Sequence, residues 1–157
     1  MTPTLRLATR DDALPIAQLS RDRIEQGLGW SWTTPRVLRS IRDHETNVVV
    51  ALAAGETLGF GIMKYQDDEA HLLLLAVRAE RERQGVGKAV VDWLERAALV
   101  AGIGRVSLEA RASNAGARAF YEHLGYREIQ SLPGYYQGRE ACVRMAHDLW
   151  IGRAVPG

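Results

Sequence analysis

The most informative stretch of the hydrophobic pattern runs from Glu69 to Ala101. It opens with a nearly continuous apolar run, His71 to Val77, which is too short for a long helix and therefore predicts a buried strand. A basic turn that contains two glycines follows, Arg81 to Lys88. From Val86 onward the apolar residues recur at helical spacing until Gly102, which predicts an amphipathic helix that ends there. We therefore expect a strand, a glycine turn and a helix in direct succession.

The same periodicities predict elements on both sides of this stretch. Before it we expect a strand over 5–8, a helix over 14–24 capped by Thr9 or Asp11, a short helix from Pro35, and a hairpin of strands 47–53 and 57–65. After it we expect a strand over 105–111, a helix capped by Ser113-Asn114 that ends at Gly125, and strands over 126–131 and 140–148. This order predicts a mixed α/β sheet with helices on its faces.

Alternation within the strand over 105–111 separates two sets of side chains. Val106, Leu108 and Ala110 point to one face, and Ser107, Glu109 and Arg111 point to the other. Glu109 is therefore expected to face away from the apolar set.

Length and charge limit the classes of protein to consider. A chain of 157 residues is long enough for one core, so we expect a single domain over 1–151 and a frayed tail over 152–157. The chain has 20 Lys and Arg residues against 19 Asp and Glu, which argues against nucleic acid or an anionic membrane as the main partner. The single cysteine, Cys142, has no intramolecular disulfide partner, and the first residues lack a signal-peptide pattern. These features favour a cytoplasmic protein, and no apolar run approaches the length of a membrane span.

The turn before the long helix predicts a phosphate ligand. A helix start presents unpaired backbone N–H groups, and the glycines allow a ligand to approach them closely. Arg83 and Lys88 add positive charge to that of the helix dipole. The dinucleotide fingerprint fails, because Val90 stands where it needs a third glycine. The nucleotide-triphosphate loop fails as well, because it needs Gly at Glu82 and Ser or Thr at Ala89.

The turn Glu82-Arg83-Gln84-Gly85-Val86-Gly87 resembles the Gln/Arg-x-x-Gly-x-Gly/Ala signature of the GNAT N-acetyltransferases. In that family the turn binds the pyrophosphate of acetyl coenzyme A. Glu82 stands where the family usually has Gln or Arg, so we expect unchanged or weakened coenzyme binding. The run from Ser107 to Tyr126 resembles the family's second block and is most similar to the RimI-like branch, which acetylates the N-terminal alanine of a ribosomal protein. The resemblance covers the chain from Ala70 to about Met145.

This resemblance implies a fold and a set of coenzyme contacts. The fold is a mixed, mostly antiparallel sheet of about seven strands, splayed in the middle, with about four helices on its faces. The implied coenzyme-binding residues are Leu75, Ala76, Val77, Arg83, Gln84, Gly85, Val86, Gly87, Lys88, Asn114, Ala117 and Tyr121. The backbones of Leu75 and Val77 would bond the acetyl and pantetheine groups. Leu74 replaces an Asn common at its position, which removes one polar contact.

The resemblance also implies catalytic roles. Acetyl transfer needs a neutral amine, and deprotonating a lysine amine at pH 7 costs about 4.6 kcal/mol, against about 1–1.4 kcal/mol for an α-amine. Glu109 matches the base of the RimI-like branch, and His71 matches a base Glu of histone-acetylating relatives; we favour Glu109. Tyr121 matches the tyrosine that protonates the leaving thiolate, and the N–H of Leu75 would meet the developing oxyanion. Neither a metal nor a nucleophilic role for Cys142 is expected.

The acceptor remains open at this level. We expect Trp30, Trp32, Tyr135 and Tyr136 to contact an acceptor amine, which is a protein N-terminus, a lysine or a small amine, in a monomer or homodimer. His44, His123 and His147 are expected at the surface. The alternatives are a coenzyme A-binding module without turnover, which Glu82 suggests, and an α/β interaction domain without a ligand.

Overall fold

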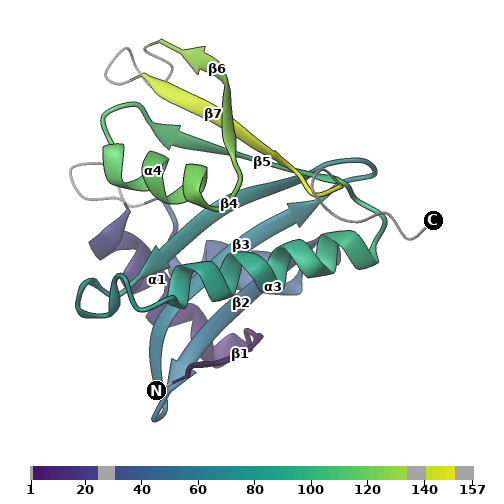
Figure 1. Ribbon diagram of the computed structural model, residues 1–157. Coiled ribbons are helices and arrows are strands. Elements are labelled where there is room, and N and C mark those ends of the chain that lie inside the picture. The colour runs from purple at the N-terminus through teal and green to yellow at the C-terminus, as the bar shows by residue number, and fades with distance from the viewer. Residues whose placement is uncertain (1, 25–30, 134–140, 151–157) are drawn as a thin grey trace.

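One seven-stranded sheet organises the computed structural model, which describes residues 2–24, 31–133 and 141–150 (Figure 1). The strand order is β1-β2-β3-β4-β5-β7-β6, and every neighbouring pair is antiparallel except β4 with β5. The strands are β1 (Thr4–Leu7), β2 (Thr46–Ala53), β3 (Glu56–Tyr65), β4 (Ala70–Val77), β5 (Arg105–Arg111), β6 (Arg127–Leu132) and β7 (Cys142–Asp148). The predicted mixed, mostly antiparallel sheet is confirmed.

Helices cover both faces of this sheet (Figure 1). They are α1 (Ala13–Arg23), α2 (Thr34–Arg42), α3 (Val86–Val100) and α4 (Ala115–His123), with short 3-10 turns η1 (Arg10–Asp12) and η2 (Ala79–Arg81). In Figure 1, α3 and α4 lie in front of the sheet and α1 lies behind it. Two separate apolar cores follow from this arrangement, one that includes residues of α3 and one that includes residues of α1 and α2.

Local sequence explains where α2 and α4 begin and where α3 ends. The side chain of Asn114 caps α4 by accepting a hydrogen bond from the N–H of Ala117 at 3.0 Å. Gly102 follows α3 with a φ of +82°, a conformation that glycine adopts at no steric cost. Pro35 lies in the first turn of α2, where its missing N–H is not needed. These caps are the ones that the sequence predicts.

The sheet splays between its two middle strands. β4 and β5 pair at only three positions, from Ala70 with Val106 to Leu72 with Leu108. Beyond Leu72 the two strands separate, and Figure 1 shows the sheet opening into an arm that holds β1–β4 and an arm that holds β5–β7. The backbone of β4 from Leu73 to Val77 is therefore left without a neighbouring strand on that side.

A bulge in β4 changes which side chains face each core. Ile62 pairs with Leu74 and Met63 pairs with Leu72, so Leu73 is an extra residue opposite β3. Leu72 packs in the core that includes residues of α3, whereas Leu74 packs in the core next to α1 and α2. Both faces of β4 are therefore buried, which explains its nearly continuous apolar sequence.

Three sequence expectations fall outside the described residues: the frayed tail over 152–157, the pair Tyr135-Tyr136 and Trp30. Within the described ranges, no helix is long and apolar enough to cross a membrane.

Candidate functional site

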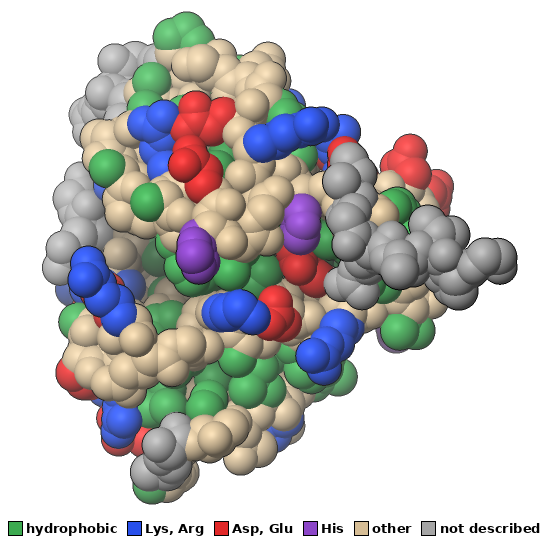
Figure 2. Space-filling view, in the orientation of Figure 1, with side chains coloured by type: hydrophobic (Ala, Val, Ile, Leu, Met, Phe, Trp, Pro, Cys, Tyr) green, Lys and Arg blue, Asp and Glu red, His purple; other side chains and the backbone are tan. Residues whose placement is uncertain are grey.

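A cleft opens where the two arms of the sheet separate. It has a volume of about 540 Å³, which is in the range of small-molecule sites. Figure 2 shows apolar side chains exposed in a groove between the upper part of the molecule and the lower part. The described lining residues come from the end of α1, from β4, from the turn before α3 and from α4: Arg23, Ile24, Leu75, Ala76, Val77, Arg81, Glu82, Arg83, Gly85, Gly87, Lys88, Asn114, Gly116, Ala117, Phe120 and Tyr121.

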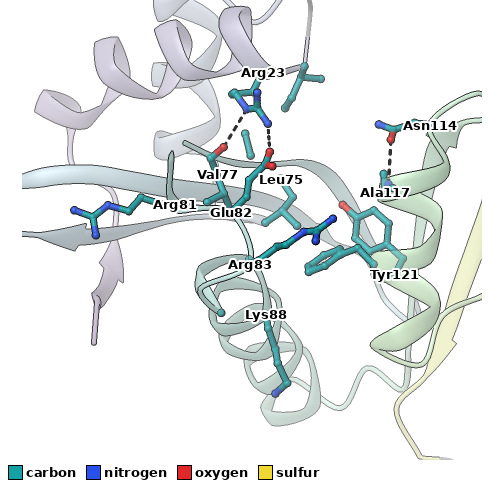
Figure 3. Close-up of a pocket in the computed structure, with 16 residues that line it drawn as sticks. Arg23, Leu75, Val77, Arg81, Glu82, Arg83, Lys88, Asn114, Ala117 and Tyr121 are labelled. Atoms are coloured by element: carbon teal, nitrogen blue, oxygen red, sulfur yellow. Dashed lines mark hydrogen bonds and ion pairs between the residues drawn. The ribbon is translucent and has the colours of Figure 1, made fainter. Parts of the chain in front are cut away.

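The turn before α3 forms the basic end of this cleft. Gly85 precedes the first residue of α3 with a φ of +84°, and Arg83 also has a positive φ, of +63°. A positive φ is uncommon for a residue with a side chain and tends to occur at functional sites. Turns of this kind direct successive backbone N–H groups toward one point, where they bind anions. Figure 3 shows the side chain of Arg83 extending toward Tyr121 while Lys88 points along α3, where its Nζ lies 2.9 Å from Asp92.

The exposed edge of β4 forms the floor of the cleft. The N–H of Arg78 donates to the carbonyl of Leu58 on the β3 side at 2.8 Å. Because alternate residues of an antiparallel strand turn their backbone groups to opposite sides, Val77 and Leu75 direct theirs toward the gap. These are the two residues whose backbone groups the resemblance implied for the coenzyme.

The carboxylate of Glu82 has a positively charged partner at the cleft. This carboxylate forms an ion pair with Arg23 at the end of α1, and the Nε of Arg23 also donates to the carbonyl of Val77 at 3.2 Å (Figure 3). The negative charge that set this turn apart from the family signature therefore has a positive partner. The sequence did not indicate Arg23, because it lies 59 residues from Glu82.

Tyr121 lies on the α4 side of the cleft. Burial raises the pKa of its hydroxyl well above the ordinary value, so the group is protonated at neutral pH. Its ring packs edge-to-face on Phe120 with 5.1 Å between the centroids. Phe120 in turn explains Gly87, since a Cβ at that position would lie 3.1 Å from the Phe120 ring. Phe120 was missed from the sequence, where it looked like a core residue of an amphipathic helix.

The two candidate bases meet on the face of the sheet opposite α4. The Nε2 of His71 lies 3.8 Å from a carboxylate oxygen of Glu109, and its Nδ1 lies 3.0 Å from the hydroxyl of Ser107. Neither candidate is among the lining residues above. Burial, as the largest cause, lowers the pKa of His71, so the imidazole is neutral at pH 7. Both side chains lie beside the point where β4 and β5 begin to separate.

Cys142 lies beside this pair, and its thiol donates to Glu109 over 3.7 Å. Burial, followed by the charge of Glu109, raises the pKa of the thiol, which disfavours a thiolate nucleophile. In the described part of the chain, no group of three or more His, Cys, Asp or Glu side chains could hold a metal ion.

Trp32 and His147 each have a partner that the sequence pattern does not show. Trp32 is only 8% exposed and packs in the core next to α1 and α2, with the guanidinium of Arg36 3.8 Å from its ring centroid. It therefore does not line the cleft, whereas Trp30, Tyr135 and Tyr136 lie outside the described residues. His147 is not a simple surface residue, because its Nδ1 lies 2.9 Å from the buried carboxylate of Glu95. The pattern of a strand does not show such a partner on a distant helix.

Comparison with known proteins agrees with this geometry. The chain is 39% identical over 95 residues to the [ribosomal protein bS18]-alanine N-acetyltransferase of Escherichia coli (strain K12). This match covers 59% of the chain and 64% of that relative, which is less than two thirds of its length. The crystal structure of the ribosomal-protein-S18-alanine N-acetyltransferase from Escherichia coli superposes with a TM-score of 0.82 at 26% identity, over 99% of this chain and 97% of that one.

A second solved structure, Ard1 from Thermoplasma volcanium, has a TM-score of 0.83 at 26% identity and covers 95% of this chain and 99% of that one. The sequence model of the acetyltransferase (GNAT) family matches residues 13–126, which is more than half of the chain. The chain therefore belongs to the acetyltransferase (GNAT) family, and its splayed sheet and the turn before α3 agree with this assignment.

Proposed function

We propose that this protein is an N-acetyltransferase that moves the acetyl group of acetyl coenzyme A to a primary amine by direct attack in a ternary complex. The observation that carries the proposal is the joining of two features in one cleft. The turn with positive φ at Arg83 and Gly85 suits a diphosphate, and the edge of β4 beyond Leu72, where no strand lies beside it, suits an extended pantetheine arm.

The residues of the cleft have separate roles in this proposal. The N–H of Leu75 stabilises the negative charge that develops on the thioester oxygen during attack. Tyr121, which is protonated at neutral pH, donates its proton to the sulfur that leaves. Asn114 and Ala117 at the start of α4 line the path of the coenzyme arm.

The acceptor amine approaches from the face of the sheet that carries Glu109 and His71. The gap beyond Leu72 allows an acetyl group in the cleft to meet an amine on that face. Glu109 accepts the amine proton, directly or through water, and His71 is the second candidate for this role. Their separation of 3.8 Å allows the neutral imidazole and the carboxylate to share one water molecule.

A protein N-terminus is the acceptor that we favour, because the relative with 39% identity is named as an alanine N-acetyltransferase of ribosomal protein bS18. An α-amine also needs less help from a base than a lysine does. Lysine and small amines are the alternatives. We further propose a cytoplasmic location, which suits a chain whose single cysteine has no intramolecular disulfide partner.

The test combines binding and turnover. Acetyl coenzyme A at saturation should raise the melting temperature, because a ligand that binds only the native state stabilises it. Release of free thiol is then measured against a panel of N-terminal peptides, lysine peptides and small amines. A melting-temperature shift without thiol release from any amine would favour a coenzyme A-binding module, and the absence of a shift would contradict both readings.

A further inference from the structure

Arg23 links helix α1 to the turn before α3 at the cleft (Figure 3). Its guanidinium pairs with the carboxylate of Glu82 and donates from Nε to the carbonyl of Val77 at 3.2 Å. The side chain of Arg23 is 35% exposed and that of Glu82 is 51% exposed, so the pair is open to solvent at the cleft. Such an exposed pair adds little to folding stability by itself. Its position suggests a different use.

The charges that line the cleft indicate that the Arg23–Glu82 pair serves ligand binding. Among the described lining residues, Arg23, Arg81, Arg83 and Lys88 are basic, and Glu82 carries the one carboxylate. This carboxylate belongs to the turn whose backbone N–H groups bind the diphosphate in the proposed function. An uncompensated negative charge there would repel the ligand. The pair with Arg23 cancels that charge and holds the side chain toward α1.

We propose that Arg23 is a positioning residue for coenzyme binding, because its pairing with Glu82 keeps a carboxylate from opposing the diphosphate. The inference rests on the proposed function and deepens it. Arg23 acts through Glu82, and its bond to Val77 keeps the guanidinium at the edge of β4. The pair makes the end of α1 part of the coenzyme site, although the residues of the glycine turn lie some 60 positions later in the chain.

A double-mutant cycle tests this proposal. The dissociation constant of coenzyme A is measured by calorimetry for the wild type, Arg23→Gln, Glu82→Gln and the double variant. We expect Arg23→Gln to weaken binding by about fivefold to tenfold, since it leaves Glu82 unpaired in a solvent-exposed site. Glu82→Gln alone should change affinity by no more than about twofold, and the double variant should return to within about twofold of the wild type.

Two controls make the cycle specific. Arg81→Gln removes a cation from the same cleft that lies near Glu80, a carboxylate that keeps its partner Arg78, so its effect should add to that of Glu82→Gln and show no coupling. Pantetheine, which lacks the diphosphate, should bind the wild type and Arg23→Gln equally well. Melting temperatures of all variants are measured without ligand to show that each is folded.

The outcomes separate this inference from the proposed function. If the wild type does not bind coenzyme A, the proposed function itself is wrong. If it does bind, but the Arg23 and Glu82 effects are additive or the double variant stays as weak as Arg23→Gln, the positioning role is wrong. An equal loss of pantetheine affinity would also overturn it, because Arg23 would then act on the shape of the cleft.

Discussion

At the scale of single residues, the protonation state of Tyr121 fits the role of an acid. Burial raises its pKa, so the hydroxyl is protonated at neutral pH and is available to donate to the sulfur while the C–S bond breaks. A group of this kind is unsuited to act as a base at neutral pH.

Replacing Tyr121 by Phe should lower kcat by about 100-fold and leave the dissociation constant of coenzyme A within about twofold of the wild type. The reason is that the ring and its packing on Phe120 remain, and only the proton donor is lost. Tyr65→Phe is the matched control, because its hydroxyl donates to the carbonyl of Leu94 and is not among the groups that line the cleft. An unchanged kcat for Tyr121→Phe would remove this residue from the mechanism.

The two candidate bases are separated by pH–rate profiles. If Glu109 accepts the proton, Glu109→Gln should lower kcat/KM by about 100-fold and displace the acid limb of its profile, whereas His71→Gln should keep that limb. The profiles are measured from pH 5 to 9 with one acceptor amine. An acid limb that moves only in His71→Gln would assign the role to His71.

His71 also predicts a pH-dependent stability. Because burial lowers its folded-state pKa below the unfolded value of about 6.5, the unfolded chain binds the proton more readily. The stabilisation is therefore present above about pH 6.5 and is lost as the pH falls through the folded pKa. The melting temperature of the wild type should drop more between pH 7.5 and 5 than that of His71→Gln. Equal drops would contradict a neutral, buried imidazole.

At the same scale, sequence predicts site residues only when the signal is local. Gly85 and Asn114 were predicted because a turn and a cap are decided within a few positions. Arg23 and Phe120 were missed, since each owes its place in the cleft to a residue of a distant element. Trp32 was predicted to contact the acceptor amine, and the structure packs its ring in the core next to α1 and α2, a placement that depends on distant residues.

At the scale of elements, the two ends of α3 offer a matched pair of glycines. Gly85 and Gly102 flank α3 with φ of +84° and +82°, and a Cβ at either position would meet no atom within 4 Å. An alanine at either site should cost about 1–2 kcal/mol of folding stability, because only the backbone conformation is disfavoured. The two positions therefore differ in their relation to the cleft and not in their steric surroundings.

Gly85→Ala should therefore weaken coenzyme A binding by about tenfold, whereas Gly102→Ala should leave it unchanged within about twofold. Calorimetry gives the affinities, and urea unfolding gives the stabilities of both variants. Equal affinities in the two variants would show that the backbone of this turn does not bind the diphosphate.

Elements were more predictable than their irregularities. The sequence predicted β5 and the start of α3 correctly, because their apolar periods are unmistakable. The bulge at Leu73 was not predicted, since four successive leucines look alike whichever face each one occupies. That bulge nevertheless turns Leu74 to one core and leaves Leu75 at the cleft.

At the scale of the whole molecule, the cleft exists because the two arms of the sheet are held together elsewhere. The β4–β5 ladder contributes only three residue pairs to that union. On the face that carries α3, Glu95 joins the arms, because it projects from α3 to the connection between α4 and β6 and to β7. The hydroxyl of Tyr126 donates to its carboxylate at 2.8 Å, and the Nδ1 of His147 lies 2.9 Å from the same oxygen.

Loss of this carboxylate should weaken the union of the arms. Glu95 is 6% exposed and Tyr126 is 2% exposed, so Glu95→Ala leaves a buried hydroxyl without its partner and a cavity beside it. We expect a loss of about 2–4 kcal/mol in the free energy of unfolding, measured with urea. Glu95→Gln should lose less, because its amide oxygen can still accept from Tyr126. Arg96→Ala, at the next and exposed position of α3, is the control and should cost under about 0.5 kcal/mol. An equally small loss for Glu95→Ala would show that the union of the arms does not depend on the contacts of Glu95 with Tyr126 and His147.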